Sequence, residues 1–132
     1  VPHSGCWYRR FVIDPLFELA PAFVHPEKRQ TIGELRDRLL VRPFRVEVLD
    51  LARSVDPVLR SLQTQFPESE LRAIRQPDEI SHDDQGLLVR LDSGPLPPWA
   101  APLKTRVGWR DVSTRMGDRQ QKLINILRSV GL

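Results

Sequence analysis

Residues Phe44–Leu51, with the sequence FRVEVLDL, decide the fold of this chain. Their first half alternates apolar and charged side chains, and their second half becomes apolar on both faces, which predicts a β-strand that runs into a core. An Asp56-Pro57 pair then begins an amphipathic stretch that ends at Pro67, and residues 71–75 predict a second strand. A strand, a helix and a strand within about thirty residues are typical of a right-handed parallel crossover.

The loop at residues 52–55 would leave the carboxyl end of the first strand, where open parallel sheets commonly bind ligands. A loop that cradles phosphate at this place needs glycines, and the sequence here, ARSV, has none. We therefore favour a sheet that supports the fold over a nucleotide site.

The chain after the second strand predicts loops and short elements. Residues 76–85 are polar and acidic, as in a surface loop, and residues 87–91 predict a short strand. Residues 93–102 hold four prolines and predict a stiff, extended connector, whose Trp99 would dock onto a partner or back onto the domain. Residues 103–109 alternate in the pattern of an edge strand with basic side chains toward water.

Two helices are predicted before the first strand. Asp14 and Pro15 indicate a helix start, with Asp14 as the N-cap. Thr31 and Glu34 predict a capping box at the start of a second helix, which would end at Pro43. Its expected buried stripe consists of Ile32, Leu35, Leu39 and Leu40.

A last helix is predicted over residues 118–130, with Gly131 as its stop. Two helices precede the first strand and only one crossover is visible, so the predicted fold class is α+β. It would consist of an N-terminal helical segment, followed by a small mixed α/β sheet region with a C-terminal helix. We divide the chain into residues 1–43, with two helices, and residues 44–132, an α/β region whose role the sequence leaves open.

The composition narrows the classes of function. The chain has 132 residues and a formal net charge of +3, and it holds no basic tract dense enough to indicate nucleic-acid binding. Its single cysteine, Cys6, excludes an internal disulfide and a cysteine zinc site, and it fits a cytoplasmic location. No apolar run approaches the length of a membrane span, so we expect no membrane partner. Phosphate-bearing small molecules are the more natural acidic ligands.

The most informative chemistry lies near the start of the chain. A histidine, two arginines and the aromatic side chains of Trp7 and Phe11 fall within nine residues there, enough to meet a phosphate and a flat ring together. A second candidate is His82 beside Asp83 and Asp84, where a metal could bind. Adjacent residues on an extended chain point to opposite sides, so we favour solvated loop residues and predict no metal site.

Residues 1–43 also carry a run of motifs at uninterrupted spacing. They are a VPH element at 1–3, an R-x-F at 9–11, the sequence PLFELAP at 15–21, an HP pair at 25–26 and a T-x-x-E-L at 31–35. This order resembles the C-terminal part of the 6-hydroxymethyl-7,8-dihydropterin pyrophosphokinases, enzymes of folate biosynthesis that transfer pyrophosphate from ATP.

The resemblance implies roles for three residues. His3 would contact the phosphates of ATP, Arg9 would act as the catalytic cation at the transferred pyrophosphoryl group, and Phe11 would stack on the pterin ring. The complete family enzyme uses ATP and magnesium, and its Asp-x-Asp pair for two magnesium ions lies before the VPH element. This chain has no Asp-x-Asp, so we expect it to be inactive as an enzyme on its own.

Two hypotheses of different class follow. In the first, the chain is a fragment or split descendant of a longer pyrophosphokinase-like protein, and a missing N-terminal portion completes its site for pterin and ATP. In the second, it is a non-catalytic protein-interaction or ligand-binding α/β module derived from that family, in which Trp99 or the basic strand meets a protein partner.

Overall fold

The structure is a computed structural model of the 132-residue chain. It describes residues 6–51, 53–92, 94–112 and 118–132. His3, one of the three predicted site residues, lies outside these ranges. None of the helices within them is long and apolar enough to span a membrane.

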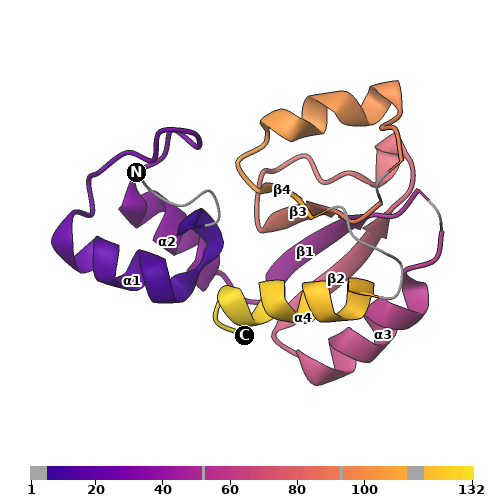
Figure 1. Ribbon diagram of the computed structural model, residues 1–132, viewed down its shortest axis with the longest axis horizontal. Helices are drawn as coiled ribbons and strands as arrows, with labels where there is room; N and C mark the ends of the chain where they lie inside the picture. The colour runs from indigo at the N-terminus through magenta and orange to yellow at the C-terminus, as the bar shows by residue number, and fades with distance from the viewer. Residues whose placement is uncertain (1–5, 52, 93, 113–117) are drawn as a thin grey trace.

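A four-stranded parallel sheet occupies the part of the chain after residue 43 (Figure 1). Its strands are β1 (Phe44–Leu49), β2 (Ser69–Ile74), β3 (Leu87–Arg90) and β4 (Trp109–Asp111), in the spatial order β2-β1-β3-β4. Helix α3 (Asp56–Gln65) connects β1 to β2, which pair in parallel, so the predicted crossover is confirmed. The later strands are added on the other side of β1.

The sheet has an apolar core on each face. Helices α3 and α4 (Arg119–Ser129) cover one face, and the 3-10 helix η3 (Pro98–Thr105) lies over the other (Figure 1). Val46 and Val48 of β1 join the larger core with Leu127 of α4. Leu49 points to the opposite face, because side chains alternate along a strand, and packs in a smaller core with Leu103.

An N-terminal helical segment lies beside the sheet (Figure 1). It consists of η1 (Cys6–Tyr8), α1 (Arg10–Leu19) and α2 (Ile32–Leu40). Its side chains Ile13, Leu35 and Leu39 are buried in the same core as the α3–α4 face of the sheet. The fold class is therefore α+β, as expected.

The start of α2 agrees with its sequence. The Thr31 hydroxyl accepts from the Glu34 N–H at 3.0 Å, and the Glu34 carboxylate accepts from the Thr31 N–H at 3.1 Å, so the predicted capping box is confirmed. Ile32 is buried as predicted, but Leu40 is 39% exposed. Leu40 is the last residue of the helix, where the apolar stripe runs past the edge of the core.

Helix α1 begins at Arg10, about one turn before the predicted start, so Asp14 as an N-cap is wrong. The Asp14 carboxylate accepts from Arg10 at 3.0 Å and from Arg36 at 3.1 Å. An ion pair four residues apart stabilises a helical turn. The helix therefore extends ahead of Pro15, although the missing N–H of proline removes one internal hydrogen bond.

The edge strand predicted at residues 103–109 is wrong for most of its length. Residues 98–105 form η3, and β4 starts only at Trp109. Pro98 has the backbone geometry that a helix start needs. Ala100 and Leu103, three residues apart, are both buried, which matches the period of a 3-10 helix better than that of a strand.

The prolines at 93–102 also form less of an extended connector than predicted, because η3 starts within them. Trp99 is half-buried and packs against the smaller core of the sheet. Of the two predictions for Trp99, docking back onto the domain is the one that the structure bears out.

Candidate functional site

Two aromatic side chains of η1 form the base of the candidate site. Trp7 and Tyr8 are 2% and 4% exposed, and their ring centroids lie 5.3 Å apart at an interplanar angle of 68°. This edge-to-face arrangement is favourable for two aromatic rings. Both rings belong to the same core as Ile13 of α1, so apolar packing fixes the turn that carries them.

Arg9 lies between a buried ring and an exposed ring. Its guanidinium carbon is 5.9 Å from the Tyr8 ring centroid and 5.8 Å from the Phe11 ring centroid. Phe11 is 68% exposed. In the part of the chain that the structure describes, Arg9 has no ion pair, and its buried Nε has no hydrogen-bond partner. Two of the three predicted site residues are therefore adjacent in space.

Arg110 of β4 lies on the same tyrosine. Its guanidinium carbon is 5.3 Å from the Tyr8 centroid, and its buried Nε has no partner among the described residues. Lys28, from the connection between α1 and α2, places its Nζ 4.2 Å from the Trp7 centroid and donates to the Trp109 carbonyl at 3.4 Å. We define Trp7, Tyr8, Arg9, Lys28 and Arg110 as the aromatic-cation cluster.

His25 fixes the turn that carries Lys28. Its side chain is 2% exposed, and its Nδ1 accepts from the backbone N–H groups of Glu27 and Lys28, both at 3.2 Å. Burial lowers the pKa of His25, with the charge of Glu27 opposing this shift and that of Lys28 adding to it. An accepting Nδ1 carries no proton, so the hydrogen bonds and the pKa favour the same neutral imidazole.

The ammonium group of Lys28 is partly removed from water. Burial is the largest cause that lowers the pKa of Lys28; the charges of Glu27 and Asp84 raise this pKa, and the smaller effects of Arg38 and Arg110 lower it. A cation that is partly removed from water and close to other cations favours the approach of an anion.

Sequence analysis singled out neither Lys28 nor Arg110. Lys28 stands between two motifs of the resemblance, and Arg110 follows the segment whose strand prediction is wrong. No spacing rule links them, because Lys28 and Trp109 are 81 positions apart. The only sequence signal is basic character, which the 20 lysines and arginines of the chain share.

The acidic loop that was the second candidate serves to attach neighbouring segments. His82 is exposed. Asp83 forms an ion pair with Arg45, and Asp84 accepts from the Val107 N–H at 2.8 Å. No group of three histidine, cysteine, aspartate or glutamate side chains that could hold a metal ion is found within the described ranges.

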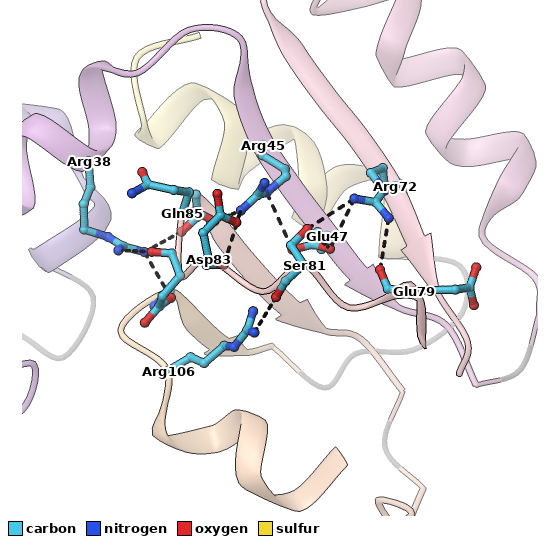
Figure 2. Close-up of polar contacts among 12 residues, drawn as sticks. Arg38, Arg45, Glu47, Arg72, Glu79, Ser81, Asp83, Gln85 and Arg106 are labelled. Carbon is cyan, nitrogen blue, oxygen red and sulfur yellow. Dashed lines mark hydrogen bonds and ion pairs between the residues drawn. The ribbon is translucent and has the colours of Figure 1, made fainter. Parts of the chain in front are cut away.

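A buried charge on β1 organises a second polar cluster (Figure 2). Glu47 is 2% exposed and lies 3.6 Å from Arg45 and 3.8 Å from Arg72, and it accepts from the Ser81 hydroxyl at 3.1 Å. Figure 2 shows these three side chains converging on Glu47, with Arg38 of α2 hydrogen-bonded to the other end of the loop that carries Ser81. Because Glu47 is satisfied by partners from its own chain, this cluster stabilises the fold.

The carboxyl ends of β1 and β3 lie side by side, because the two strands pair in parallel. Asp50 is 1% exposed and accepts from two N–H groups of the following loop at 3.1 and 3.3 Å and from Arg75 at 3.1 Å. Asp92, after β3, pairs with Arg119 of α4. These carboxylates hold the loop in place, which agrees with a supporting role for this edge.

No protein-family model matches this chain, and neither a curated protein nor a solved structure matches it. Its function is therefore inferred from its own side chains.

Proposed function

We propose that this chain is a pyrophosphokinase-like protein of folate biosynthesis, which supplies residues for ATP-dependent pyrophosphoryl transfer to 6-hydroxymethyl-7,8-dihydropterin. The observation that carries the proposal is the position of Arg9 beside Phe11, at 5.8 Å. Arg9 has no ion pair among the described residues, and Phe11 is exposed although it is large and apolar. A cation next to a free aromatic face suits a ligand that brings a flat ring and phosphates together.

In the proposed reaction, the hydroxymethyl oxygen of the pterin attacks the β-phosphorus of ATP. The bond from the β-phosphorus to the oxygen that bridges to the α-phosphate breaks, the hydroxyl proton is released, and AMP leaves. Arg9 would neutralise the negative charge on the phosphate oxygens, and Phe11 would hold the pterin ring by stacking. His3 keeps its predicted role at the ATP phosphates.

Magnesium accompanies ATP in the family that the sequence resembles. The described residues hold no group of three metal-ligating side chains, so they do not fit a protein-held magnesium site. We assign no metal ligand to this chain. In the proposed enzyme, the ligands would come from an N-terminal portion that carries the acids of the family.

Calorimetric titration of this chain, joined to the upstream part of a family enzyme, with 6-hydroxymethyl-7,8-dihydropterin, a non-hydrolysable ATP analogue and magnesium tests the role of Phe11. We expect saturable binding by the wild-type chain and a loss of roughly tenfold or more with Phe11→Ala, because stacking on an aromatic side chain contributes about 1–3 kcal/mol. Phe23→Ala is the matched control, since Phe23 is also exposed, at 54%, in the same segment. Equal weakening by both changes, or no binding by the wild type, would contradict the proposal.

The transfer reaction tests Arg9. When this chain is joined to the upstream part of a family enzyme, we expect AMP formation from ATP and the pterin, and Arg9→Ala should remove most of it. Arg128→Ala removes an exposed arginine of α4 and should leave the rate unchanged. A joined chain that folds but forms no AMP would count against the enzyme.

A non-catalytic interaction module is the second candidate. It is favoured by the exposed apolar side chains of the N-terminal segment, among them Leu19 at 83% and Val24 at 52%. Exposed apolar patches of this kind are typical of docking surfaces. Only the enzyme predicts pterin binding that depends on Phe11.

A further inference from the structure

Three positive side chains from distant parts of the chain converge on two buried aromatic rings. Arg9 and Arg110 lie 5.9 and 5.3 Å from the Tyr8 centroid, and Lys28 lies 4.2 Å from the Trp7 centroid. We infer that the aromatic-cation cluster binds the diphosphate group of a small molecule, and that Arg110 and Lys28 are binding residues of this site together with Arg9. The inference rests on the proposed function for the role of Arg9. It goes beyond the proposed function because Lys28 and Arg110 lie outside the motifs of the resemblance.

Partial burial without an ion pair sets these cations apart. The other described lysines and arginines that lack a carboxylate partner are exposed, except Arg106, which donates to the Ser81 carbonyl. Within the described residues, a carboxylate pairs with Arg10, Arg36, Arg38, Arg42, Arg45, Arg72, Arg75, Arg90 and Arg119. Over the same residues, Arg9, Lys28 and Arg110 have no such pair. Like charges that gather in a partly buried place repel each other until a counter-charge joins them. An anionic ligand would supply that charge.

The three donors suit phosphate oxygens. A guanidinium presents a planar fork that can bond two oxygens at once, and an ammonium adds a compact charge. The rings of Tyr8 and Trp7 already hold these groups by cation–π contacts, so little side-chain freedom would be lost on binding. Arg9 also directly precedes α1, whose first turn has no acidic residue, so the N–H groups of that turn add positive potential.

The number of cations favours a diphosphate over a single phosphate. A single phosphate group carries a charge of about −1.5 to −2 at pH 7, which leaves part of the charge of three cations uncompensated. A diphosphate carries more negative charge and more acceptor oxygens. It therefore matches the three cations better in charge and in the number of acceptors.

The α/β region would thereby have a role in ligand binding. β4 carries Arg110, and Lys28 donates to the carbonyl of Trp109, the residue before it. Arg38 of α2 donates to the carbonyl oxygens of Asp84 and Gly86, which holds the helical segment against the loop that leads into β3. Through these contacts, a residue from the region without family resemblance reaches Tyr8.

Calorimetric titration of the full chain with inorganic pyrophosphate tests the inference. We expect saturable binding, with a loss of roughly tenfold or more for Arg110→Gln and for Arg9→Gln, because hydrogen bonds to charged groups are the strong class. Arg128→Gln makes the same charge change at an exposed arginine of α4 and should bind as the wild type does. No binding by the wild type, unchanged binding by Arg110→Gln, or equal loss with Arg128→Gln overturns the inference.

A second variant and spectra of the wild-type chain separate a loss of binding from a loss of folding. Arg110→Lys keeps the positive charge on β4 but removes the planar fork, so we expect an affinity between those of the wild type and Arg110→Gln. In nitrogen-15 spectra of the wild type, the Nε–H resonances of Arg9 and Arg110 should shift together as pyrophosphate is added. Unshifted resonances at saturation overturn the inference even if the variants do not fold.

Failure of this inference is distinguishable from failure of the proposed function. Phe23→Ala should leave pyrophosphate binding unchanged, because Phe23 is an exposed ring outside the aromatic-cation cluster. Pyrophosphate binding without any pterin binding supports the anion site and counts against the pterin enzyme. Pterin binding that depends on Phe11, in a chain that does not bind pyrophosphate, supports the pterin enzyme and counts against the anion site.

Discussion

Arginine side chains have two distinct roles in this chain. Arg45 and Arg72 lie against the buried carboxylate of Glu47, and loss of one partner of such a pair leaves a buried charge uncompensated. Arg9 and Arg110 lie on the Tyr8 ring instead. Their removal leaves no carboxylate of the described residues without its partner, so changes at these two positions should affect ligand binding more than folding.

The pH dependence of stability should report the state of His25. Burial lowers its pKa below the ordinary 6.5, so the unfolded chain binds the proton more tightly than the folded chain. The contribution of His25 is therefore complete above pH 6.5 and is lost as the pH falls below that value through the lower pKa of the folded state. Urea unfolding measured across this range should show the midpoint fall with pH.

Two substitutions isolate the contribution of His25. His25→Asn keeps a side-chain acceptor for the N–H groups of Glu27 and Lys28, and it should reduce the fall in midpoint. His82→Asn removes an exposed histidine and should leave the fall as it is in the wild type. If His25→Asn unfolds with the full pH dependence, His25 is not its source.

Only part of the site could be predicted from residue patterns. Arg9 and Phe11 are two positions apart, so a local motif suffices to place them together. Lys28, from the connection between α1 and α2, and Arg110, from β4, reach the rings of Trp7 and Tyr8 through tertiary contacts that no local pattern encodes. The role of His3 stays a prediction, because His3 lies outside the described residues.

Among the elements, those with a local signal were predictable. The capping box of α2 and the glycine stop after α4 each depend on residues within one turn of each other. The crossover through α3 was predicted from the apolar periodicity of each of its elements. η3 was not predictable, because residues 103, 105 and 107 alternate with basic residues and a glycine as in a strand, while the preceding prolines favour a helix start. The start of α1 was misplaced. Asp14, the predicted N-cap, instead accepts a hydrogen bond from Arg36 of another helix.

The entry into β3 should depend on a glycine. Gly86 has a φ of +67°, and an added Cβ would lie 2.0 Å from the Arg45 carbonyl oxygen on β1. Since the clash is with backbone, it cannot be relieved by a side-chain rotation. We expect Gly86→Ala to lower the free energy of unfolding by at least about 2 kcal/mol in urea titration.

Gly94→Ala is the matched control for this change. No atom lies within 4 Å of a Cβ added at Gly94, so we expect a change within about 0.5 kcal/mol. A Gly86→Ala chain as stable as Gly94→Ala would mean that the approach of β3 to β1 is looser than described.

At the scale of the whole molecule, a few cations join the helical segment to the α/β region. Lys28 donates to Trp109, Arg42 donates to the Val130 carbonyl at 3.4 Å, and Arg38 donates to Gly86 at 2.9 Å. The predicted division at residue 43 separates the helical segment from the α/β region by their secondary structure. Their apolar side chains nevertheless form one core, from Trp7 to Val130. The inferred diphosphate site depends on this junction, because its cations come from both sides.

Arg38→Met should weaken the junction while keeping the bulk of the side chain. The arginine is 11% exposed, and its loss would leave the carbonyl oxygens of Asp84 and Gly86 without their donor. We expect the free energy of unfolding to fall by about 1.5–3 kcal/mol, the range for hydrogen bonds to charged groups. Amide hydrogen exchange should then be faster in α2 than in β1, and pyrophosphate affinity should fall although no ligand-contacting residue has changed.

The control for the junction is Arg36→Met, two positions earlier on the same helix. Arg36 pairs with Asp14 of α1 and lies on the Phe17 ring, so its contacts stay inside the helical segment. It should lower stability without changing pyrophosphate affinity, because β4 would keep its place against η1. Equal affinity in Arg38→Met and Arg36→Met would mean that the packing of the shared core alone sets Arg110 over Tyr8. In that case the polar contacts of Arg38 would add stability but no specificity to the arrangement of the two parts.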